Sequence, residues 1–256
     1  MRLVRFRWGD GIFYGVLAGE MIRPLARPPF EGLSQTEDEI PLAEVVLLAP
    51  CEPSKIVALG LNYRDHAAEF GSPLPEEPLL FLKPGTAVIG PDADIVYPQM
   101  SRHVDFEAEL AVVMGRTARR VSQAAAFEYI LGYTAINDVT ARDLQKKDGQ
   151  FTRSKSFDTF APLGPWIETE ISNPDNLTVE AYVNGERRQH SHTGNLVFGV
   201  AYLVSFISRI MTLLPGDVIA TGTPSGVGPM QPGDVVEIRL EGIGSLRNRV
   251  VTEEGE

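Results

Sequence analysis

Short apolar runs, many of them alternating with polar residues, dominate the hydrophobic pattern of this chain. Up to residue 50 these runs are LVRFRW, GIFYGVLAGEMI and AEVVLLAP, with Gly, Asp and Pro between them. That pattern predicts a small β-rich region over residues 1–50. From Lys55 onward, KIVALGLN predicts a buried strand, and PLLFLKP and TAVIG predict two more. We therefore expect a second, larger domain over residues 51–256.

The segment VDFEAELAVVMG shows the most informative alternation. A period of two places its side chains on two opposite faces of a strand. The apolar face holds Val104, Phe106, Ala108 and Leu110, and the acidic face holds Asp105, Glu107 and Glu109. A strand over GYTAIND follows, and Asn-Gly between strand-like runs in LTVEAYVNGERRQ predicts a hairpin.

Helices are predicted at only a few places. They are NYRDHAAEFG closed by Gly71, SQAAAFEYI, VTARDLQKK, and a core helix within residues 196–207. Strands and helices do not alternate regularly, as they would in a doubly wound parallel sheet. The sequence predicts a mixed, β-rich roll or sandwich.

Composition narrows the classes of partner. The chain of 256 residues has 34 acidic and 23 basic residues, and its net charge of -11 repels nucleic acids and anionic membranes. The apolar stretch 196–207 is shorter than the roughly 20 residues that span a bilayer, and the N-terminus lacks the layout of a secretory signal. The single cysteine, Cys51, suits a reducing compartment, where we expect an inert buried thiol. We predict a cytoplasmic protein.

The acidic face of VDFEAEL is a candidate metal site. Side chains two apart on a strand lie about 6.6–7 Å from each other, so Glu107 and Glu109 can reach one ion. Asp138, at the end of the next predicted strand, can complete the set. Mg²⁺ or Mn²⁺ prefers such oxygen ligands. From the spacing alone, a solvated face of an edge strand explains the pattern better.

Several long motifs favour the metal site over a solvated strand face. VDFEAELAVVMG, GYTAINDVTARDLQ, SKSFDTFAPLGP and PGDVIATGTPSGVG resemble, in this order, the fumarylacetoacetate hydrolase family from Lys55 to the end. The resemblance implies a mixed β-sandwich roll with a few helices over residues 51–256, usually in homodimers. It also implies that Glu107, Glu109 and Asp138 bind Mg²⁺ or Mn²⁺, with Ca²⁺ as a non-native occupant. Residues 1–50 match the family weakly.

The same resemblance implies a mobile segment that contains Asn62, Tyr63, His66 and Glu69. His66 and Glu69 stand three residues apart, so they share a face of a helical turn, where the carboxylate can orient the imidazole. We expect His66 to act as a general acid/base with Glu69 in support, and Asn62 and Tyr63 to contact substrate. Without the family, a surface histidine on a short helix would be the better interpretation.

Four further residues fall in the matching motifs. Lys155 in SKSFD is expected to act in catalysis, and Lys83 in FLKP, Gln150 in DGQFTRSKSFD and Thr223 in ATGTPSGVG are expected to bind substrate. An acidic protein that holds an anionic substrate needs local positive charge. The alternatives are lysines that snorkel at the end of an apolar run, and a plain Gly/Pro turn around Thr223.

The function that the resemblance implies is metal-dependent enolate chemistry on a small anionic oxo acid. The sequence motifs are most similar to those of bacterial isomerases and decarboxylases of homoprotocatechuate breakdown, which act on 2-hydroxyhepta-2,4-diene-1,7-dioate and its carboxylated precursor. Acylpyruvate hydrolysis and oxaloacetate decarboxylation are the alternatives within the family. A metal-stabilised β-sandwich that only binds a carbohydrate or a partner chain is the alternative outside enzymes.

Overall fold

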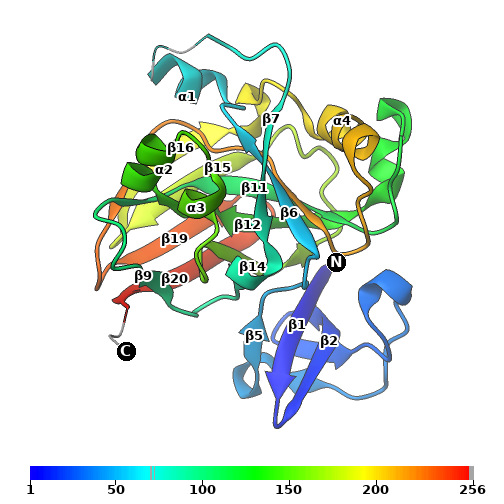
Figure 1. The fold of residues 1–256 in the computed structure, drawn as a ribbon. Helices are drawn as coiled ribbons and strands as arrows, with labels where there is room; N and C mark the ends of the chain where they lie inside the picture. Colours follow the sequence, from blue (N-terminus) through cyan, green and yellow to red (C-terminus); the bar gives the residue numbers. More distant parts are fainter. Residues whose placement is uncertain (70, 72, 254–256) are drawn as a thin grey trace.

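Three β-sheets and four short α-helices make up the part of the chain that the structure describes, residues 1–69, 71 and 73–253 (Figure 1). The structure is a computed structural model. Its largest sheet has twelve strands, most of them antiparallel. In sheet order they are β4 (Ile40–Pro41), β3 (Met21–Pro24), β2 (Gly11–Ala18), β1 (Arg2–Trp8), β14 (Ala161–Glu168), β12 (Ile130–Asn137), β11 (Ala108–Met114), β17 (Val218–Ala220), β6 (Lys55–Gly60) and β7 (Leu79–Pro84), with β5 (Val46–Leu48) beside β1 and β8 (Val88–Ile89) beside β14.

Two smaller sheets complete the β structure. The five-stranded sheet runs β16 (Glu186–His192), β15 (Thr178–Val183), β19 (Val235–Leu240), β20 (Gly244–Thr252) and β9 (Ile95–Tyr97). The three-stranded sheet runs β13 (Thr140–Ala141), β10 (Val104–Phe106) and β18 (Gly228–Met230). The predicted hairpin is confirmed, because β15 and β16 are joined by Asn184 and Gly185 at φ 52° and 82°, as the turn requires.

The helices are short. They are α1 (Arg64–Glu69), α2 (Arg142–Asp148), α3 (Thr152–Lys155) and α4 (Val200–Ile210), with 3₁₀ turns η1 (Pro29–Glu31), η2 (Leu42–Glu44), η3 (Gly85–Ala87), η4 (Gln123–Tyr129) and η5 (Thr193–Asn195). The predicted helix over SQAAAFEYI is thus a 3₁₀ segment, and the core helix begins later than expected, at Val200. No helix within the described residues is both long and apolar enough to cross a membrane.

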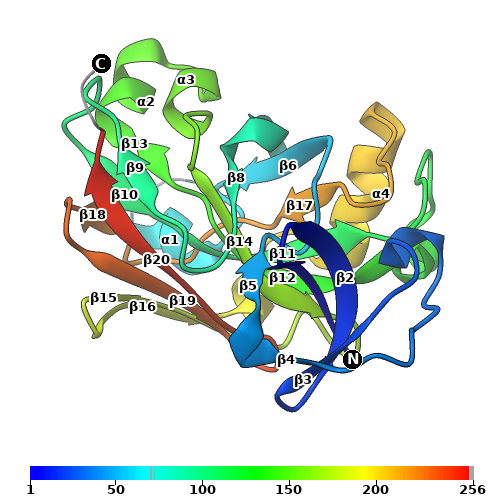
Figure 2. The same ribbon diagram turned by 90° about the horizontal axis from the view of Figure 1, so that it is seen from below.

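The main core lies between the twelve-stranded and five-stranded sheets. Leu110 and Val112 of β11 belong to one buried cluster with Ile238 of β19 and Leu246 of β20. Side chains on the opposite face of β11, such as Val113, belong to a second cluster. The expected β-rich sandwich roll is confirmed by this arrangement of sheets (Figure 2).

The N-terminal region extends the main sheet. Arg2 and Leu3 of β1 pair with Glu168 and Ile167 of β14, and the blue strands lie at one side of the molecule in Figures 1 and 2. The region has a small core of its own, formed by Val4, Phe6, Leu17, Ile22 and Ile40. The division of the chain at residue 50 stays a prediction.

The acidic segment departs from the expected single strand. The chain leaves the three-stranded sheet after Phe106 and enters the main sheet at Ala108, so Glu107 lies at the break between β10 and β11. The predicted apolar face is confirmed, because all four of its residues belong to the main core. The opposite face is not solvated, since Asp105, Glu107 and Glu109 are 4%, 5% and 0% exposed. An ordinary edge-strand face is therefore excluded.

Candidate active site

Three buried carboxylates converge where β10 gives way to β11. One oxygen from each of Glu107, Glu109 and Asp138 lies within 4.8 Å of the other two. The pairing of β11 with β12 aligns Ala108 with Asn137, and the Asp138 amide then donates to the Glu107 carbonyl at 2.9 Å. Backbone register thus places Asp138 beside the two glutamates, as the metal-site prediction requires.

The carboxylates have the properties of a cation site. Glu109 Oε2 accepts a hydrogen bond of 2.7 Å from the Gly222 amide, but its Oε1 is buried without a hydrogen-bond partner among the described residues. Burial, followed by the charges of Asp138 and Glu107, raises the pKa of Glu109 well above its usual value. Such a carboxylate is costly unless a positive group meets it. The donor set therefore fits a hard divalent cation.

Two lysines supply positive charge around Asp138. Lys155 Nζ donates to Asp138 Oδ2 at 2.7 Å and to Glu107 Oε2 at 2.8 Å, while Lys83 Nζ donates to Asp138 Oδ1 and to the Val139 carbonyl. Burial lowers the pKa of Lys83 despite its pairing with Asp138. For Lys155, the two carboxylates outweigh burial and raise the pKa. Lys155 is the firmly charged member of the pair.

Glu107 is held in its ionised form. Burial alone would raise its pKa, but ion pairs with Lys155 and Arg142 outweigh burial and lower the pKa to about 2. Arg142, at the start of α2, donates from Nη2 to Glu107 Oε1. At neutral pH this carboxylate is therefore available as a ligand.

His66 and Glu69 share one face of α1, as expected. His66 Nδ1 lies 3.3 Å from Glu69 Oε2, and the Gly226 amide donates to both oxygens of Glu69 at 3.2 and 3.3 Å. The Asp65 side chain accepts from the His66 amide at 2.8 Å and also from the Ser191 hydroxyl. Contacts from two other elements thus fix the position of the helix that carries His66.

A cavity of about 290 Å³ joins these groups. Its polar walls hold four predicted site residues and three residues of α2, and its remaining walls are apolar or backbone. The polar lining consists of His66, Glu107, Arg142, Gln145, Lys146, Lys155 and Thr223, and the other lining residues are Leu59, Gly60, Leu61, Leu79, Phe81 and Phe151. The arrangement suits a small anionic molecule with an apolar middle.

Comparison with known proteins assigns this architecture to a family. Residues 55–251 match the family profile described as Fumarylacetoacetate (FAA) hydrolase C-terminal. The chain belongs to the fumarylacetoacetate hydrolase family. Residues 1–50 match a second profile, described as Rv2993c-like, N-terminal. The resemblance seen in the motifs is confirmed.

Three members of the fumarylacetoacetate hydrolase family illustrate the range of its activities. The 2-hydroxyhepta-2,4-diene-1,7-dioate isomerase of Mycobacterium marinum is 46% identical, with 100% of both chains covered and a TM-score of 0.93. The 4-hydroxyphenylacetate degradation bifunctional isomerase/decarboxylase of Salmonella dublin is 41% identical over 96% of this chain and 60% of its own length. Maleylpyruvate hydrolase of Sphingobium sp. SYK-6, solved with a manganese(II) ion and pyruvate, is 34% identical, with 99% and 100% covered and a TM-score of 0.84.

Asn62 and Tyr63, which the family motif marked as substrate contacts, lie outside this cavity. The Asn62 side chain donates to the carbonyls of Phe198 and Thr221 at 3.1 and 2.8 Å and accepts from the Phe198 amide at 2.9 Å. Tyr63 is fully buried. The Tyr63 hydroxyl has no hydrogen-bond partner among the described residues. The expected contact of these two residues with substrate stays a prediction.

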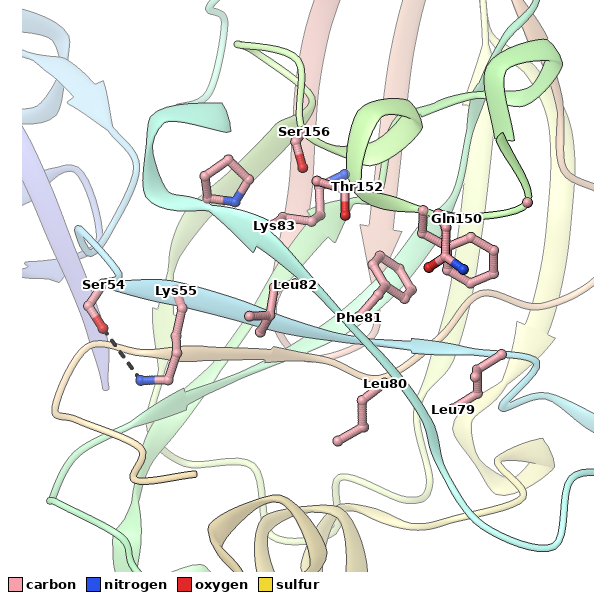
Figure 3. Close-up of a pocket in the computed structure, with 13 residues that line it drawn as sticks. Ser54, Lys55, Leu79, Leu80, Phe81, Leu82, Lys83, Gln150, Thr152 and Ser156 are labelled. Atoms are coloured by element: carbon pink, nitrogen blue, oxygen red, sulfur yellow. Dashed lines mark hydrogen bonds between the residues drawn. The ribbon is translucent and has the colours of Figure 1, made fainter. Parts of the chain in front are cut away.

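Gln150 and Lys83 lie outside the carboxylate-lined cavity, and their expected contact with substrate stays a prediction. Gln150 lines a larger cavity of about 830 Å³, which Figure 3 shows along β7, with Lys55 at its other end. The smaller cavity is lined by Gln145 of α2, a helix that ends at Asp148, before Gln150. Lys83 is 0% exposed and acts on Asp138 rather than facing the carboxylate-lined cavity.

Thr223 lies in the cavity wall, but its hydroxyl is already engaged. It donates to the Ala108 carbonyl at 3.0 Å and accepts from Gln189 Nε2 at 2.9 Å. Gln189 Oε1 in turn accepts from the Ala108 amide at 2.9 Å. These bonds tie the 221–226 loop to the strand that carries Glu109.

Arg142 and Gln145 are the site residues that the motifs did not single out. They stand three apart on α2, and Arg142 Nη1 donates to Gln145 Oε1 at 2.7 Å. The spacing of these polar residues at i and i+3 in TARDLQ was a usable signal, since it places both on one helix face. They give the cavity a cationic end beside Glu107.

Proposed function

We propose that this protein is a divalent-metal-dependent isomerase/decarboxylase of 2-oxo or 2-hydroxy-enoic dicarboxylic acids, of the homoprotocatechuate type, which works through an enolate. The observation that carries the proposal is the convergence of Glu107, Glu109 and Asp138 in one cavity with His66 and Arg142. The isomerase of Mycobacterium marinum and the bifunctional enzyme of Salmonella dublin support this choice of reaction.

The three carboxylates would hold Mg²⁺ or Mn²⁺, with Ca²⁺ as a non-native occupant. A bound dication would polarise a 2-oxo group and stabilise the negative charge that develops on its oxygen. Glu107 and Asp138 lie against Lys155, and Lys83 adds a second ammonium group. With the cation present, it and Lys155, Lys83 and Arg142 make four positive groups around the three carboxylates, so the site would attract an anion.

His66 is the proposed proton carrier. It lines the cavity from α1, and Glu69 lies 3.3 Å from its Nδ1, where the carboxylate can orient the ring. Moving a proton between two carbons of a dienoate requires one group that both accepts and donates it. An imidazole can perform both tasks near neutral pH.

Arg142, Gln145 and Lys146 would hold the second carboxylate of the substrate. They form the polar wall contributed by α2. An arginine can bind a carboxylate through two N–H groups, and the apolar lining by Leu79 and Phe81 suits the carbon chain between the two acidic ends. This division of the cavity favours a dicarboxylic acid.

Carbon–carbon hydrolysis of an acylpyruvate is the second candidate, with oxaloacetate decarboxylation a further one. The maleylpyruvate hydrolase of Sphingobium, with 34% identity over 99% of this chain, favours the hydrolase. In that reaction His66 and Glu69 would activate a water molecule rather than move a substrate proton.

A panel of oxo acids, incubated with the purified protein and Mg²⁺ or Mn²⁺, separates these reactions. An absorbance change at constant mass identifies an isomerase, release of CO₂ a decarboxylase, and two smaller acids a hydrolase. Removal of the metal by a chelator then tests the non-enzymatic alternative. If the metal is catalytic, its removal should abolish turnover and lower the melting temperature only slightly. If the metal is structural in a binding module, its removal should chiefly lower the melting temperature.

The proposed assembly is a homodimer that forms through the edge of β7, in a cytoplasmic protein. β7 ends the main sheet, and its Leu79 and Leu82 are 46% and 48% exposed. Ile210 of α4, 57% exposed, lines a further apolar hollow against this strand. An edge whose exposed side chains are uncharged can pair with the same edge of a second copy around a two-fold axis.

A further inference from the structure

The guanidinium of Arg142 is held by three different partners. Nε donates to Asp105 Oδ2 at 2.8 Å, Nη1 donates to Gln145 Oε1 at 2.7 Å, and Nη2 donates to Glu107 Oε1. A guanidinium has five N–H groups. Two therefore remain, one on each terminal nitrogen, on a side chain that lines the cavity.

Asp105 lies outside the cavity and is itself held in place by the surrounding sheet. Its side chain is 5% exposed, and it lies in the middle of β10, which pairs with Thr140 of β13 on one side and Pro229 of β18 on the other. Its second oxygen, Oδ1, lies 2.8 Å from His103 Nε2. The α2 helix is tied to the same segment, since the Arg142 amide donates to the His103 carbonyl at 2.7 Å.

The three partners of Arg142 differ in where they lie relative to the cavity and the carboxylate cluster. Glu107 is a candidate metal ligand, and Gln145 lines the cavity from a helix. Asp105 belongs neither to the cavity lining nor to the carboxylate cluster. What it does contact is Nε, the nitrogen nearest the flexible stem, and fixing this nitrogen sets the plane of the guanidinium.

We propose that Asp105 is a positioning residue that determines specificity for a second carboxylate on the substrate. It holds Nε of Arg142, so that the two remaining N–H groups keep one orientation in the cavity. Without Asp105, Arg142 keeps its bonds to Glu107 and Gln145 but loses the third contact, and the second carboxylate of the substrate meets a less firmly oriented partner. This inference rests on the proposed function, since it assumes a dicarboxylic substrate.

Two inert oxo acids of equal carbon number test the proposal. 2-Oxoadipate has a carboxylate at the far end, and 2-oxohexanoate has a methyl group there. Their dissociation constants are measured by calorimetry in saturating Mg²⁺ for the wild type and for Asp105→Ala. We expect the wild type to prefer 2-oxoadipate by about tenfold or more, as for one charged hydrogen-bonded contact, and Asp105→Ala to lower this ratio to about two. Affinity for 2-oxohexanoate should change less than about twofold.

Asp143→Ala is the matched control. Asp143 is the neighbour of Arg142 on α2 and anchors that helix through the Ser101 hydroxyl at 2.6 Å and the Arg102 amide at 3.1 Å, without touching the guanidinium. The preference for 2-oxoadipate should survive in Asp143→Ala. If Asp105→Ala does not fold, Asp105→Asn keeps the shape without the charge and should lower the ratio severalfold.

The outcomes separate the inference from the proposed function. A wild type that binds both acids equally would overturn the dicarboxylic substrate class itself. A wild type that discriminates, with an unchanged ratio in the Asp105 variants, overturns only the role of Asp105. Equal loss of both affinities would mean that Asp105 acts through Glu107 and the cation, and it also overturns the inference.

Discussion

The backbone amide of Gly222 donates to Oε2 of Glu109 at 2.7 Å, and this single bond leaves Oε1 of the same carboxylate without a partner among the described residues. Gly222 has a φ of +98°, and a Cβ added there would lie 2.9 Å from the Cβ of Asn62. The turn therefore needs glycine in order to bring its amide this close. It fixes one oxygen of Glu109 and leaves the other for a cation.

Replacing Glu109 by Gln should abolish tight cation binding. The variant keeps an oxygen for the Gly222 amide but removes the charge that a dication needs, so we expect the dissociation constant for Mn²⁺ to rise by more than about a hundredfold, the upper range for outer partners of a metal site. Calorimetric titration measures it. The exposed Glu128→Gln on η4 serves as the control. Equal Mn²⁺ affinity in the two variants would remove Glu109 from the site.

His66→Ala should separate metal binding from proton transfer. His66 is not one of the three carboxylate ligands, so Mn²⁺ affinity should stay within about twofold, while turnover of the substrate found in the oxo-acid panel should fall about a hundredfold or more. His190→Ala is the matched control, because His190 is 55% exposed on β16 and pairs with Glu180, outside the cavity lining. Turnover that survives in His66→Ala would exclude the imidazole from the mechanism.

The sequence predicted the carboxylate face correctly because the pleat of a strand dictates it. Alternation at positions 104 to 110 depends only on a period of two, and it persists across the break at Glu107. The break itself was not predictable, since it depends on which strands pair on either side, β13 and β18 for β10 but β12 and β17 for β11. Long-range pairing leaves no local trace in VDFEAEL.

The roles of individual side chains within a motif were harder to predict than the motif itself. The family motif placed Asn62 in the right segment, but only the structure shows that its side-chain amide donates to the backbone carbonyls of Phe198 and Thr221. Arg142 was missed for the opposite reason. Its spacing from Gln145 places both on one helix face, but nothing local marks that face as part of a site. Its importance follows from Glu107 and Asp105, which contact it from β10 and the residue after it.

Cys51 should be unreactive in the folded protein at alkaline pH. Burial raises the pKa of its thiol to about 12. Between the ordinary thiol pKa and that value the unfolded chain loses the proton and the folded chain keeps it, so the thiolate forms only on unfolding and stability falls as the pH rises through this window. At pH 9 we expect a thiol reagent to react more than about a hundredfold more slowly with native protein than with protein in denaturant.

Since Cys51 is the only cysteine in the chain, the thiol signal needs no correction for other sites. The reaction is followed by the absorbance of the released reagent, with and without guanidinium, from pH 7 to pH 10. Rapid labelling of the native protein would contradict the buried position of Cys51 and would point to an open route through the cavity that it lines with Arg5 and Ser54.

Leu82→Glu should convert the proposed dimer into a monomer. Leu82 lies on the terminal strand of the main sheet, and it lines both the large cavity along β7 and the apolar hollow against α4. Pairing two copies across this edge would bring the two introduced carboxylates into an apolar contact, where each loses its hydration. Light scattering after gel filtration gives the mass directly. Leu33→Glu, at a leucine with a similar exposure of 45% in the N-terminal region, is the control and should remain a dimer. A wild-type mass of one chain would rule out the homodimer, and a dimeric Leu82→Glu would place the interface on a different face.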